Sequence, residues 1–436
     1  MERKYALLTF GCQMNIHDSE RVAGLLEREG WVETGPESAD AVILITCCVR
    51  ESAERKLYGR LDGLRTLKER GAVIAVGGCL AQKEGERLRE RAPYVDLVFG
   101  TQRYPGIASL LDRAAEGAVC STSMDGLDLR GLPCKKRESF RCWVTITNGC
   151  DNFCTYCVVP YVRGREMSRP LEEVLEEVGE HVAGGAIEVN LLGQNVDSYR
   201  RKEEGRSRFA DLLRVLGSSF PGIWLRFTTS HPRDFDLEVI RAIAETPGVC
   251  EYVHLPVQAG SDRVLEAMGR GYGRDEYLEK ASALRREVED VALSTDIMVG
   301  FPGEREEDFQ ATLELVEACR FETAYTFVFN PRPGTPAALL EDDVPTEVKR
   351  NRMERLTELT RRLTAQALLA EAGREREALV YGPSRRDPGF WVARTRRNFP
   401  VHFQRGAEDL TGRLVRVRVT GAGSWSLRGK LVEVLG

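Results

Sequence analysis

The sequence has no apolar stretch long enough to cross a lipid bilayer. Its longest, residues 41–49, has the length of a β-strand, whereas a membrane-spanning helix needs about 20 apolar residues. The first ten residues enter a strand-like pattern directly, without the apolar segment and small-residue cleavage site of a signal peptide. We therefore expect a cytoplasmic protein that does not associate with membranes.

The chain also lacks a strong excess of charge of either sign. Its 62 Lys and Arg residues nearly balance its 67 Asp and Glu residues, so the net charge of −5 gives no indication of a nucleic-acid ligand. The charge is unevenly distributed, however. Residues 371–436 contain 13 basic and 7 acidic side chains, so this tail carries +6 and the preceding residues carry −11. A basic tail on an acidic body is typical of a separate binding surface.

Internal repeats and low-complexity tracts are absent, and 436 residues are enough for about three domains. Residues 1–100 alternate between short apolar segments and amphipathic ones. This pattern predicts strands at residues 5–10, 41–46, 73–76 and 95–99, with helices at residues 18–30, 52–71 and 83–91. Such alternation is typical of a doubly wound parallel sheet, which we place at residues 1–118. Residues 101–138 give weak signals, and we expect small irregular elements there and a linker at residues 119–138.

The alternation restarts near residue 140 and continues to about residue 330. Strands are predicted at residues 142–147, 187–192, 224–228, 252–255, 292–299 and 323–329. Six strand–helix units predict a partial (β/α)6 barrel within a core domain at residues 139–370, with functional groups at the carboxyl ends of its strands. Residues 344–372 have the pattern of one long, charged helix that leads into the tail.

The tail, residues 371–436, changes to short strands with glycine turns, at residues 377–381, 391–394, 399–403, 414–419 and 427–434. This pattern predicts a small β-barrel. Arginines alternate with aromatic residues, which fits RNA contact, although part of the aromatic set must form the core. The residues concerned are Arg385, Arg386, Arg394, Arg396, Arg397, Arg413, Arg416, Arg418, Phe390, Trp391, Phe399, Phe403 and Trp425.

Twelve cysteines indicate metal or catalytic chemistry, because a cytoplasmic protein is not expected to depend on disulfides. Cys150, Cys154 and Cys157 form a C-x3-C-x2-C run directly after the first predicted barrel strand. Three thiolates in so short a loop can bind three irons of a [4Fe–4S] cluster and leave the fourth iron open to another ligand. A structural zinc site is the alternative, but it needs a fourth Cys or His, and the first one that follows the run is His181, more than twenty residues on.

Three further cysteines, Cys12, Cys47 and Cys79, each follow a predicted strand of the N-terminal domain. The carboxyl ends of neighbouring parallel strands meet at one edge of a sheet, so these thiols are predicted to lie together, with chance placement as the alternative. Cys48 would point away from Cys47 if the strand geometry continues, so only one of the two can belong to such a site. The remaining cysteines are interpreted as core or incidental: Cys120, Cys134, Cys142, Cys250 and Cys319.

These motifs, in this order, resemble the radical S-adenosylmethionine methylthiotransferases, and within that family the MiaB-type enzymes, which modify dimethylallyladenosine in tRNA. The resemblance covers nearly the whole chain. It depends on residues 11–15, 46–47, 78–82, 149–169, 191–196, 230–232, 254–258, 299–304 and 332–336. In the tail, residues 382–384, 395–398 and 424–429 resemble a TRAM domain, an RNA-binding β-barrel. The chain departs from the family at Ile45, where Asn is usual, and at Cys48, where a small polar residue is common.

The resemblance implies two [4Fe–4S] clusters and two uses of S-adenosylmethionine. Cys150, Cys154 and Cys157 would hold the cluster that generates a 5′-deoxyadenosyl radical, and Cys12, Cys47 and Cys79 would hold an auxiliary cluster that supplies sulfur. Tyr156 and Gln194 correspond to positions that contact the adenine and the methionine amino group; packing of the loop is the alternative for Tyr156. The reaction implied is methylthiolation of carbon 2 of N(6)-isopentenyladenosine at position 37 of tRNA anticodon loops.

Other polar residues allow more than one interpretation. Arg163, Arg165 and Arg169 could meet the cofactor carboxylate or a tRNA phosphate, since arginine binds both groups in bidentate fashion, or they could belong to a solvated loop. His231 and His254 are interpreted as packed, hydrogen-bonded histidines in preference to metal ligands. The carboxylates of Asp296 and Glu304 are interpreted as structural.

Two alternative functions remain open from the sequence. A sibling methylthiotransferase would act on threonylcarbamoyladenosine in tRNA or on an aspartate of a ribosomal protein. A non-catalytic RNA-binding or iron–sulfur scaffold protein would not cleave S-adenosylmethionine. Besides tRNA, we expect a reducing electron-donor protein as a partner, and a monomeric chain.

Overall fold

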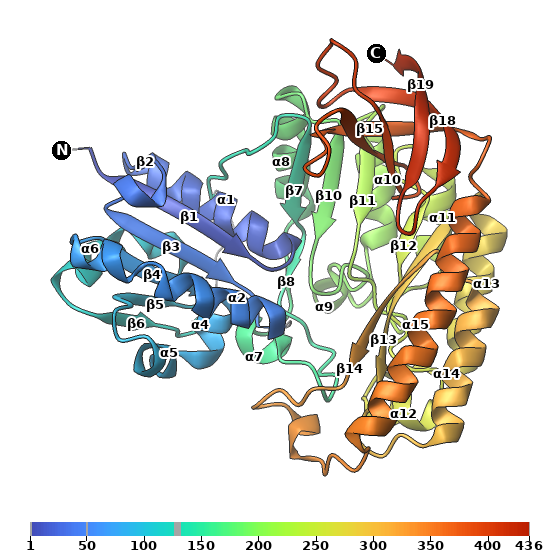
Figure 1. Ribbon diagram of the computed structural model, residues 1–436, viewed down its shortest axis with the longest axis horizontal. Helices are drawn as coiled ribbons and strands as arrows, with labels where there is room; N and C mark the ends of the chain where they lie inside the picture. Colours follow the sequence, from blue (N-terminus) through green and yellow to red (C-terminus); the bar gives the residue numbers. More distant parts are fainter. Residues whose placement is uncertain (1, 49–50, 126–131, 436) are drawn as a thin grey trace. The chain divides into compact units, whose positions relative to one another are not determined.

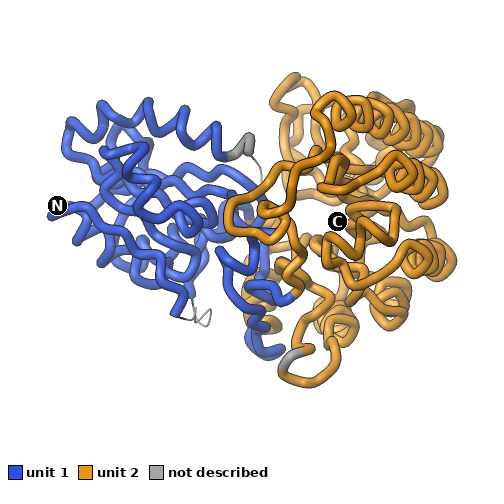
Figure 2. Tube along the Cα trace, turned by 90° about the horizontal axis from the view of Figure 1, so that it is seen from below, with its two compact units in different colours: residues 1–138, 143–151, 157–173 blue, residues 139–142, 152–156, 174–436 orange. Residues whose placement is uncertain are grey.

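A computed structural model describes residues 2–48, 51–125 and 132–435, without the side chains of residues 51–53 and 202. The chain divides into two compact units (Figure 2). Unit 1 comprises residues 1–138, 143–151 and 157–173, and unit 2 comprises residues 139–142, 152–156 and 174–436. None of the helices in the described part of the chain is long and apolar enough to span a membrane.

Unit 1 is built on a six-stranded sheet with the strand order β2-β1-β3-β4-β5-β6, in which every neighbouring pair is parallel. Its strands are β1 (Lys4–Phe10), β2 (Val32–Glu33), β3 (Ala41–Thr46), β4 (Val73–Gly78), β5 (Leu97–Phe99) and β6 (Val119–Ser121). Every residue of β3 and β4 is buried. Continuous apolar strands of this kind are typical of a sheet that is covered on both faces.

Helices cover both faces of this sheet (Figure 1). On one face, α1 (Gln13–Arg28) and α6 (Ile107–Glu116) pack against Ile43, Ile45 and their neighbours. On the other, α2 (Glu51–Asp62), α3 (Arg65–Glu69), α4 (Cys79–Glu84) and α5 (Glu86–Arg91) contribute to a core around Val42 and Leu44. The predicted doubly wound arrangement is confirmed.

The structure differs from the sequence-based expectation in three places. Residues 101–138 contain regular elements, namely η2 (Tyr104–Gly106), α6 and β6, so the expectation of irregular structure was wrong there. Strand β6 has three residues, and it is defined by pairing with β5 and not by an apolar pattern of its own. The predicted helix over residues 52–71 is divided near Gly63, and the helix over residues 83–91 is divided at Gly85, whose φ is +53°.

The barrel-like core has two three-stranded sheets, ordered β11-β10-β7 and β12-β13-β14, and all of their strands belong to unit 2 except the last three residues of β7. The strands are β7 (Arg141–Thr145), β10 (Glu188–Leu192), β11 (Trp224–Phe227), β12 (Tyr252–His254), β13 (Ala292–Val299) and β14 (Thr323–Val328). A parallel bridge between Leu225 and Val249 connects β11 to the segment before β12. All six predicted strands are present, and the predicted partial barrel is confirmed.

The connections of the core are mainly helical. They include α8 (Leu171–Ala183), α9 (Arg201–Glu204), α10 (Phe209–Ser219), α11 (Leu237–Glu245), α12 (Asp262–Ala267), α13 (Arg274–Glu287), α14 (Glu306–Cys319) and the long α15 (Thr346–Leu369). A shorter element of unit 2 is η3 (Pro336–Leu339), whereas η1 (Pro36–Ser38), β8 (Thr147–Asn148), α7 (Val159–Arg163) and β9 (Met167–Ser168) belong to unit 1.

The C-terminal part of unit 2 is a closed β-barrel in the order β15-β16-β17-β19-β18, as predicted. Its strands are β15 (Glu375–Pro383), β16 (Phe390–Thr395), β17 (Pro400–Gln404), β18 (Leu414–Ala422) and β19 (Leu427–Leu435). Trp391, Phe399 and Phe403 fill its interior. A second apolar cluster joins the barrel to the core, because Leu379 packs with Phe140 and Trp224.

Candidate functional site

Cys12, Cys47 and Cys79 lie at the carboxyl ends of three adjacent strands of unit 1. Phe10 of β1 pairs with Thr46 of β3, and Thr46 pairs with Gly78 of β4. These three paired residues lie side by side across the sheet, and each cysteine follows its own paired residue by one or two positions. The structure therefore brings the three predicted thiols to one edge of the sheet, which is where parallel α/β folds bind ligands.

Glycine is required next to two of these cysteines. Gly11 has a φ of +138°, and a Cβ on it would lie 2.6 Å from the Cβ of Cys47. Gly78 has a φ of +94°, and its Cβ would lie 2.6 Å from the carbonyl oxygen of Thr46. Both backbone conformations favour glycine. The strand ends can approach each other this closely only because these side chains are absent.

The thiols of this edge also contact one another. A hydrogen bond with Cys47 lowers the pKa of Cys12 to about 6. The Cys12 Sγ also donates to Asn15 Oδ1 at 3.2 Å, and Asn15 Nδ2 donates to the Thr46 carbonyl at 3.3 Å, which ties the ends of β1 and β3 together. Cys12 is thus held next to Cys47, and its lowered pKa favours the thiolate.

Cys48 interacts with a different cysteine. Its side chain forms a hydrogen bond with Cys79, which raises the pKa of Cys48 well above its usual value and lowers that of Cys79. Cys48 also packs in the apolar core on the α2 side of the sheet. The structure therefore distinguishes the two adjacent cysteines: Cys47 pairs with Cys12, and Cys48 with Cys79.

Arg163, at the end of α7, lies against the same group of thiols. Its side chain is buried, with Nε donating to Cys79 Sγ at 3.3 Å and Nη2 donating to Asp18 Oδ2 at 2.5 Å. The alternative that Arg163 belongs to a solvated loop was therefore wrong, because its guanidinium is buried against Asp18 and Cys79. Sequence reasoning missed the contact because Cys79 and Asp18 are 84 and 145 residues away from Arg163.

The C-x3-C-x2-C run occupies the loop between β8 and α7, as predicted. Cys150 and Cys154 are buried and Cys157 is partly buried. Gly149 precedes the run with a φ of +81°, and a Cβ there would lie 2.2 Å from the carbonyl oxygen of Arg165. The loop that carries the three thiols therefore depends on glycine at its first turn.

Cys154 has two basic neighbours within unit 2. Arg270 Nη1 donates to Cys154 Sγ at 3.4 Å, and His231 Nε2 lies 3.8 Å from the same sulfur. Burial, together with the charge of Arg270, lowers the pKa of His231 far below its usual value, so its ring is neutral. His231 is packed as the sequence suggested, but it lies beside a cysteine of the run. Arg270 was missed, since nothing in its local pattern distinguishes it from a surface arginine.

Tyr156 and Gln194 both lie in unit 2. The Tyr156 hydroxyl is 3.4 Å from Arg270 Nη1, so Arg270 contacts both Cys154 and this tyrosine. Gln194 is partly buried in the turn that follows β10. Their roles in binding S-adenosylmethionine stay predictions.

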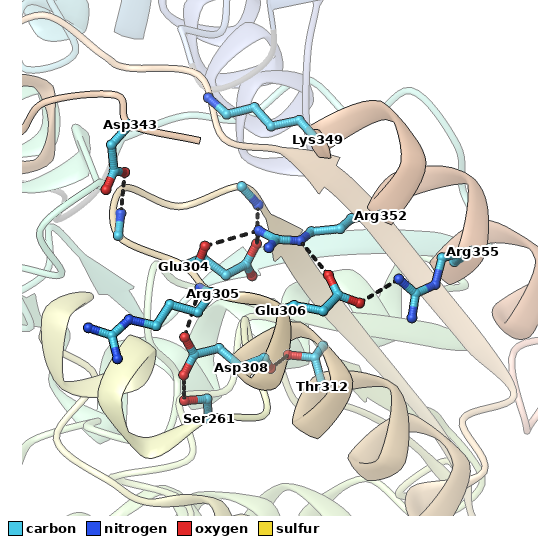
Figure 3. A network of polar contacts seen from close by, with 12 residues as sticks. Ser261, Glu304, Arg305, Glu306, Asp308, Thr312, Asp343, Lys349, Arg352 and Arg355 are labelled. Carbon is cyan, nitrogen blue, oxygen red and sulfur yellow. Dashed lines mark hydrogen bonds and ion pairs between the residues drawn. The ribbon is translucent and has the colours of Figure 1, made fainter. Parts of the chain in front are cut away.

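Glu304, His254 and Asp296 make structural contacts, as expected. Glu304 Oε2 accepts from the Gly300 backbone at 2.7 Å and from Arg352 Nη1 at 2.8 Å, which joins the loop after β13 to α15 (Figure 3). His254 Nδ1 is hydrogen-bonded to Ser294 Oγ at 2.8 Å, and its Nε2 lies 3.6 Å from Asp296. Arg165 is largely exposed and pairs with Asp151, whereas buried Arg169 donates to the Thr145 carbonyl.

Cys134, interpreted from the sequence as core or incidental, lies beside His17 and Glu20. Its Sγ is 3.9 Å from His17 Nδ1 and 3.8 Å from Glu20 Oε2. Arg21 Nε donates to His17 Nε2 at 2.8 Å, which leaves the proton of a neutral imidazole on Nδ1. That nitrogen would have to bind a metal, so this tautomer does not suit a metal centre.

The basic residues of the C-terminal barrel fall into two groups. Arg396 pairs with Glu251 at 2.7 Å, and Arg397 pairs with Glu371, so the expectation that they face RNA was wrong. By contrast, Arg385 and Arg386 are exposed, and so are the aromatic side chains of Phe390 and Trp425. Trp391, Phe399 and Phe403 form the core, in agreement with the expected division of the aromatic set.

Three family models match the chain, one for each expected part. Residues 4–100 match an uncharacterized protein family, UPF0004; residues 144–316 match the Radical SAM superfamily; and residues 370–432 match the TRAM domain. The chain is 46% identical to the tRNA-2-methylthio-N(6)-dimethylallyladenosine synthase of Carboxydothermus hydrogenoformans, over 99% of this chain and 100% of that protein. The synthase of Moorella thermoacetica is also 46% identical, over 99% of each chain. This chain belongs to the MiaB-type radical S-adenosylmethionine methylthiotransferases.

Among solved structures, the fold of this methylthiotransferase is similar to that of the radical S-adenosylmethionine methyltransferase TsrM from Kitasatospora setae. The TM-score is 0.58 at 17% sequence identity, and the match covers 77% of this chain and 75% of that one. Membership of the radical S-adenosylmethionine superfamily implies a [4Fe–4S] cluster and S-adenosylmethionine. Cys150, Cys154 and Cys157, of which the first two are buried and the third is partly buried, are close together in the sequence and are suited to such a cluster, because thiolates are its protein ligands.

Proposed function

We propose that this chain is a tRNA-2-methylthio-N(6)-dimethylallyladenosine synthase, which adds a methylthio group to carbon 2 of N(6)-isopentenyladenosine at position 37 of tRNA anticodon loops. The observation that carries this proposal is 46% identity, over 99% of this chain, to proteins of that name. The two sets of cysteines support it, since each set can bind three irons of one [4Fe–4S] cluster.

Cys150, Cys154 and Cys157 would hold the radical-generating cluster, with the fourth iron left for S-adenosylmethionine. A cluster held by these thiolates would supply the electron for the cleavage of S-adenosylmethionine, which is the source of the radical chemistry needed at an unreactive carbon. Arg270 keeps Cys154 in place through its hydrogen bond to Sγ, and its contact with the Tyr156 hydroxyl orients this ring for the adenine of the cofactor. Gln194 would bind the methionine amino group.

Cys12, Cys47 and Cys79 would hold the auxiliary cluster. A cluster at this edge would supply the sulfur that is transferred, and a second S-adenosylmethionine would supply the methyl group. Asn15 fixes Cys12 against the end of β3, and Arg163 fixes Cys79. Three thiolates give the incomplete ligand set that such a role requires, because one iron then stays accessible to an external group.

The C-terminal barrel would bind the tRNA. Its exposed arginines would contact phosphates, while Phe390 and Trp425 offer exposed rings for unstacked bases. The target lies in a single-stranded loop, from which one base can turn outward into the core. A reducing electron-donor protein, a monomeric state and a cytoplasmic location complete the proposal, with domain boundaries at residues 118, 138 and 370.

The decisive experiment is anaerobic reconstitution with iron and sulfide, followed by reduction and addition of S-adenosylmethionine and isopentenylated tRNA. We expect the methylthio nucleoside by mass spectrometry after digestion of the tRNA. Parallel reactions with tRNA that carries threonylcarbamoyladenosine, and with ribosomal protein, test the sibling activities. Deoxyadenosine without the methylthio product would contradict the substrate, and no cleavage of S-adenosylmethionine would favour a scaffold protein.

Two cysteine variants separate the proposed roles of the clusters. Cys154→Ala is expected to abolish formation of 5′-deoxyadenosine. Cys12→Ala is expected to retain it and to lose only the methylthio product. Loss of deoxyadenosine in both variants would contradict the division into a radical site and a sulfur site.

A further inference from the structure

Arg163 is a buried cation whose hydrogen bonds go to two targets in unit 1. Nη2 and Nη1 donate to the two carboxylate oxygens of Asp18, at 2.5 and 3.4 Å, and Nε donates to Cys79 Sγ at 3.3 Å. Only 3% of its surface is exposed. The hydrogen bonds of the guanidinium therefore go both to a carboxylate, which neutralises its charge, and to a sulfur.

The backbone at Arg163 is held as firmly as its side chain. Thr101 Oγ1 donates to the Val162 carbonyl at 2.6 Å, and Gln102 Nε2 donates to the Arg163 carbonyl at 3.3 Å. Both donors belong to the loop that follows β5. The end of α7 is thus attached to the same sheet edge that carries the cysteines. The contact with Cys79 is therefore held by hydrogen bonds to the backbone of Arg163 as well as by those of its side chain.

A buried pair of arginine and aspartate does not by itself stabilise a fold more than apolar residues would. The third hydrogen bond of Arg163 goes to a thiol, which is a weak acceptor while it is protonated and a strong one as a thiolate. This geometry suits a Cys79 that carries negative charge, as a cluster ligand does.

Hydrogen bonds to the ligand sulfurs and the local net charge set the reduction potential of an iron–sulfur cluster. Reduction adds negative charge, so a cation 3.3 Å from a ligand sulfur favours the reduced form. Asp18 opposes this effect with a charge of the other sign. Arg163 and Asp18 should therefore shift the potential of a cluster at this edge in opposite directions.

We infer that Arg163 is a positioning residue of the auxiliary site: it holds Cys79 through its Nε hydrogen bond and raises the reduction potential of the cluster bound by Cys12, Cys47 and Cys79. Asp18 limits this effect and keeps the guanidinium in place. The inference rests on the proposed function, because it assumes a cluster at this edge. Arg163 also follows Cys157 by six residues, so one short segment joins the last cysteine of the radical set to the cation of the auxiliary set.

The test uses the full chain with Cys150, Cys154 and Cys157 all replaced by Ala, so that the auxiliary cluster is the only one present. Its midpoint potential is measured by redox titration monitored by electron paramagnetic resonance. We expect Arg163→Gln to shift the potential to a more negative value and Arg163→Lys to shift it less. Asp18→Asn should shift it to a more positive value. The matched control is Arg169→Gln, which removes another buried arginine that donates to the Thr145 carbonyl; it should leave the potential unchanged.

A purely structural role for Arg163 predicts a different result. The Arg163 and Asp18 variants would both lose iron, and their midpoint potentials would not shift in opposite directions. Equal potentials in Arg163→Gln and the parent protein would overturn the inference, as would shifts in the same direction for Arg163→Gln and Asp18→Asn. If Arg163→Gln fails to bind iron, the direction in which Asp18→Asn and Arg163→Lys shift the midpoint potential still tests the inference. Absence of any cluster in the parent triple variant would instead contradict the proposed function.

Discussion

The Tyr381 hydroxyl of the C-terminal barrel donates a hydrogen bond to Glu188 of the core, at 2.9 Å from Oε1 and 3.0 Å from Oε2. The Glu188 carboxylate also accepts from Arg226 Nε at 2.7 Å. Arg226 in turn donates to the carbonyl oxygens of Thr395 and Arg396. One buried carboxylate and one buried guanidinium therefore attach the β-barrel to strands β10 and β11.

Removal of one member of this pair should destabilise unit 2 strongly. Glu188→Ala leaves the charge of Arg226 buried without its counter-ion, which typically costs about 3–5 kcal/mol. We expect a corresponding loss in the free energy of unfolding, measured by urea denaturation with circular dichroism. Glu204→Ala is the control, because it removes a carboxylate that pairs with Arg200 at the surface. A loss of similar size in both variants would contradict the assignment.

The same carboxylate predicts a dependence of stability on pH. Burial alone would raise the pKa of Glu188, but Arg226 and the hydrogen bonds outweigh it and lower the pKa below the usual 4.5. Its contribution is therefore complete above about pH 4.5 and is lost as the pH falls through the lower, folded-state value. The urea midpoint of the native protein should decrease more steeply below pH 4.5 than that of Glu188→Gln. Parallel decreases would show that other groups dominate.

The sequence predicted those parts of the protein that depend on regular patterns. Alternating strands and helices determine a parallel sheet, and the edge of that sheet brings together Cys12, Cys47 and Cys79 although they are far apart in the chain. The contact of Arg163 with Asp18 and Cys79 could not be predicted, because it depends on how α7 packs against the sheet. Arg270 was missed for the same reason.

The errors in the C-terminal barrel have a different cause. Composition indicates that arginines are present in a β-barrel, but not which of them meet acidic residues elsewhere in the fold. Arg396 and Arg397 find Glu251 and Glu371, which lie outside the strands of the barrel. Charge counted along the sequence therefore overestimated the number of arginines that are open to RNA.

Gly11→Ala should disrupt the auxiliary site selectively. The new Cβ would lie 2.6 Å from the Cβ of Cys47, so the ends of β1 and β3 would have to separate. We expect the reconstituted protein to bind about four irons per chain in place of about eight, the content of two [4Fe–4S] clusters. Gly30→Ala is a matched control, since Gly30 also has a positive φ but has nothing within 4 Å of the added Cβ. Full iron content in Gly11→Ala would contradict the prediction.

Arg385 and Arg386 should contribute to tRNA binding through charge alone. Both are exposed on the barrel, so Arg385→Gln with Arg386→Gln should weaken binding and reduce the slope of log affinity against log salt by about 1 for each phosphate that an arginine neutralises. The measurement is a salt series of filter-binding or anisotropy titrations with isopentenylated tRNA. Arg396→Gln is the comparison: its pairing with Glu251 predicts lower stability with the salt slope retained. An unchanged slope in the double variant would place the RNA on another face.

Cys47 and Cys48 are adjacent, yet their replacement should have different consequences. Cys47 shares a hydrogen bond with Cys12, whereas Cys48 forms one with Cys79 and packs in the apolar core. The hydrogen bond with Cys79, together with burial, raises the pKa of Cys48 well above its usual value, which disfavours the thiolate that binds iron, so we expect Cys48 to be the poorer iron ligand of the two.

Cys47→Ala should therefore reduce the iron content of the reconstituted protein from about eight to about four per chain, the content of one [4Fe–4S] cluster. Cys48→Ala should retain both clusters and lose only some stability, since it removes one buried sulfur. Iron analysis and absorption spectra of the two variants, prepared side by side, check this. If Cys48→Ala loses the cluster and Cys47→Ala keeps it, the assignment of these two cysteines must be exchanged.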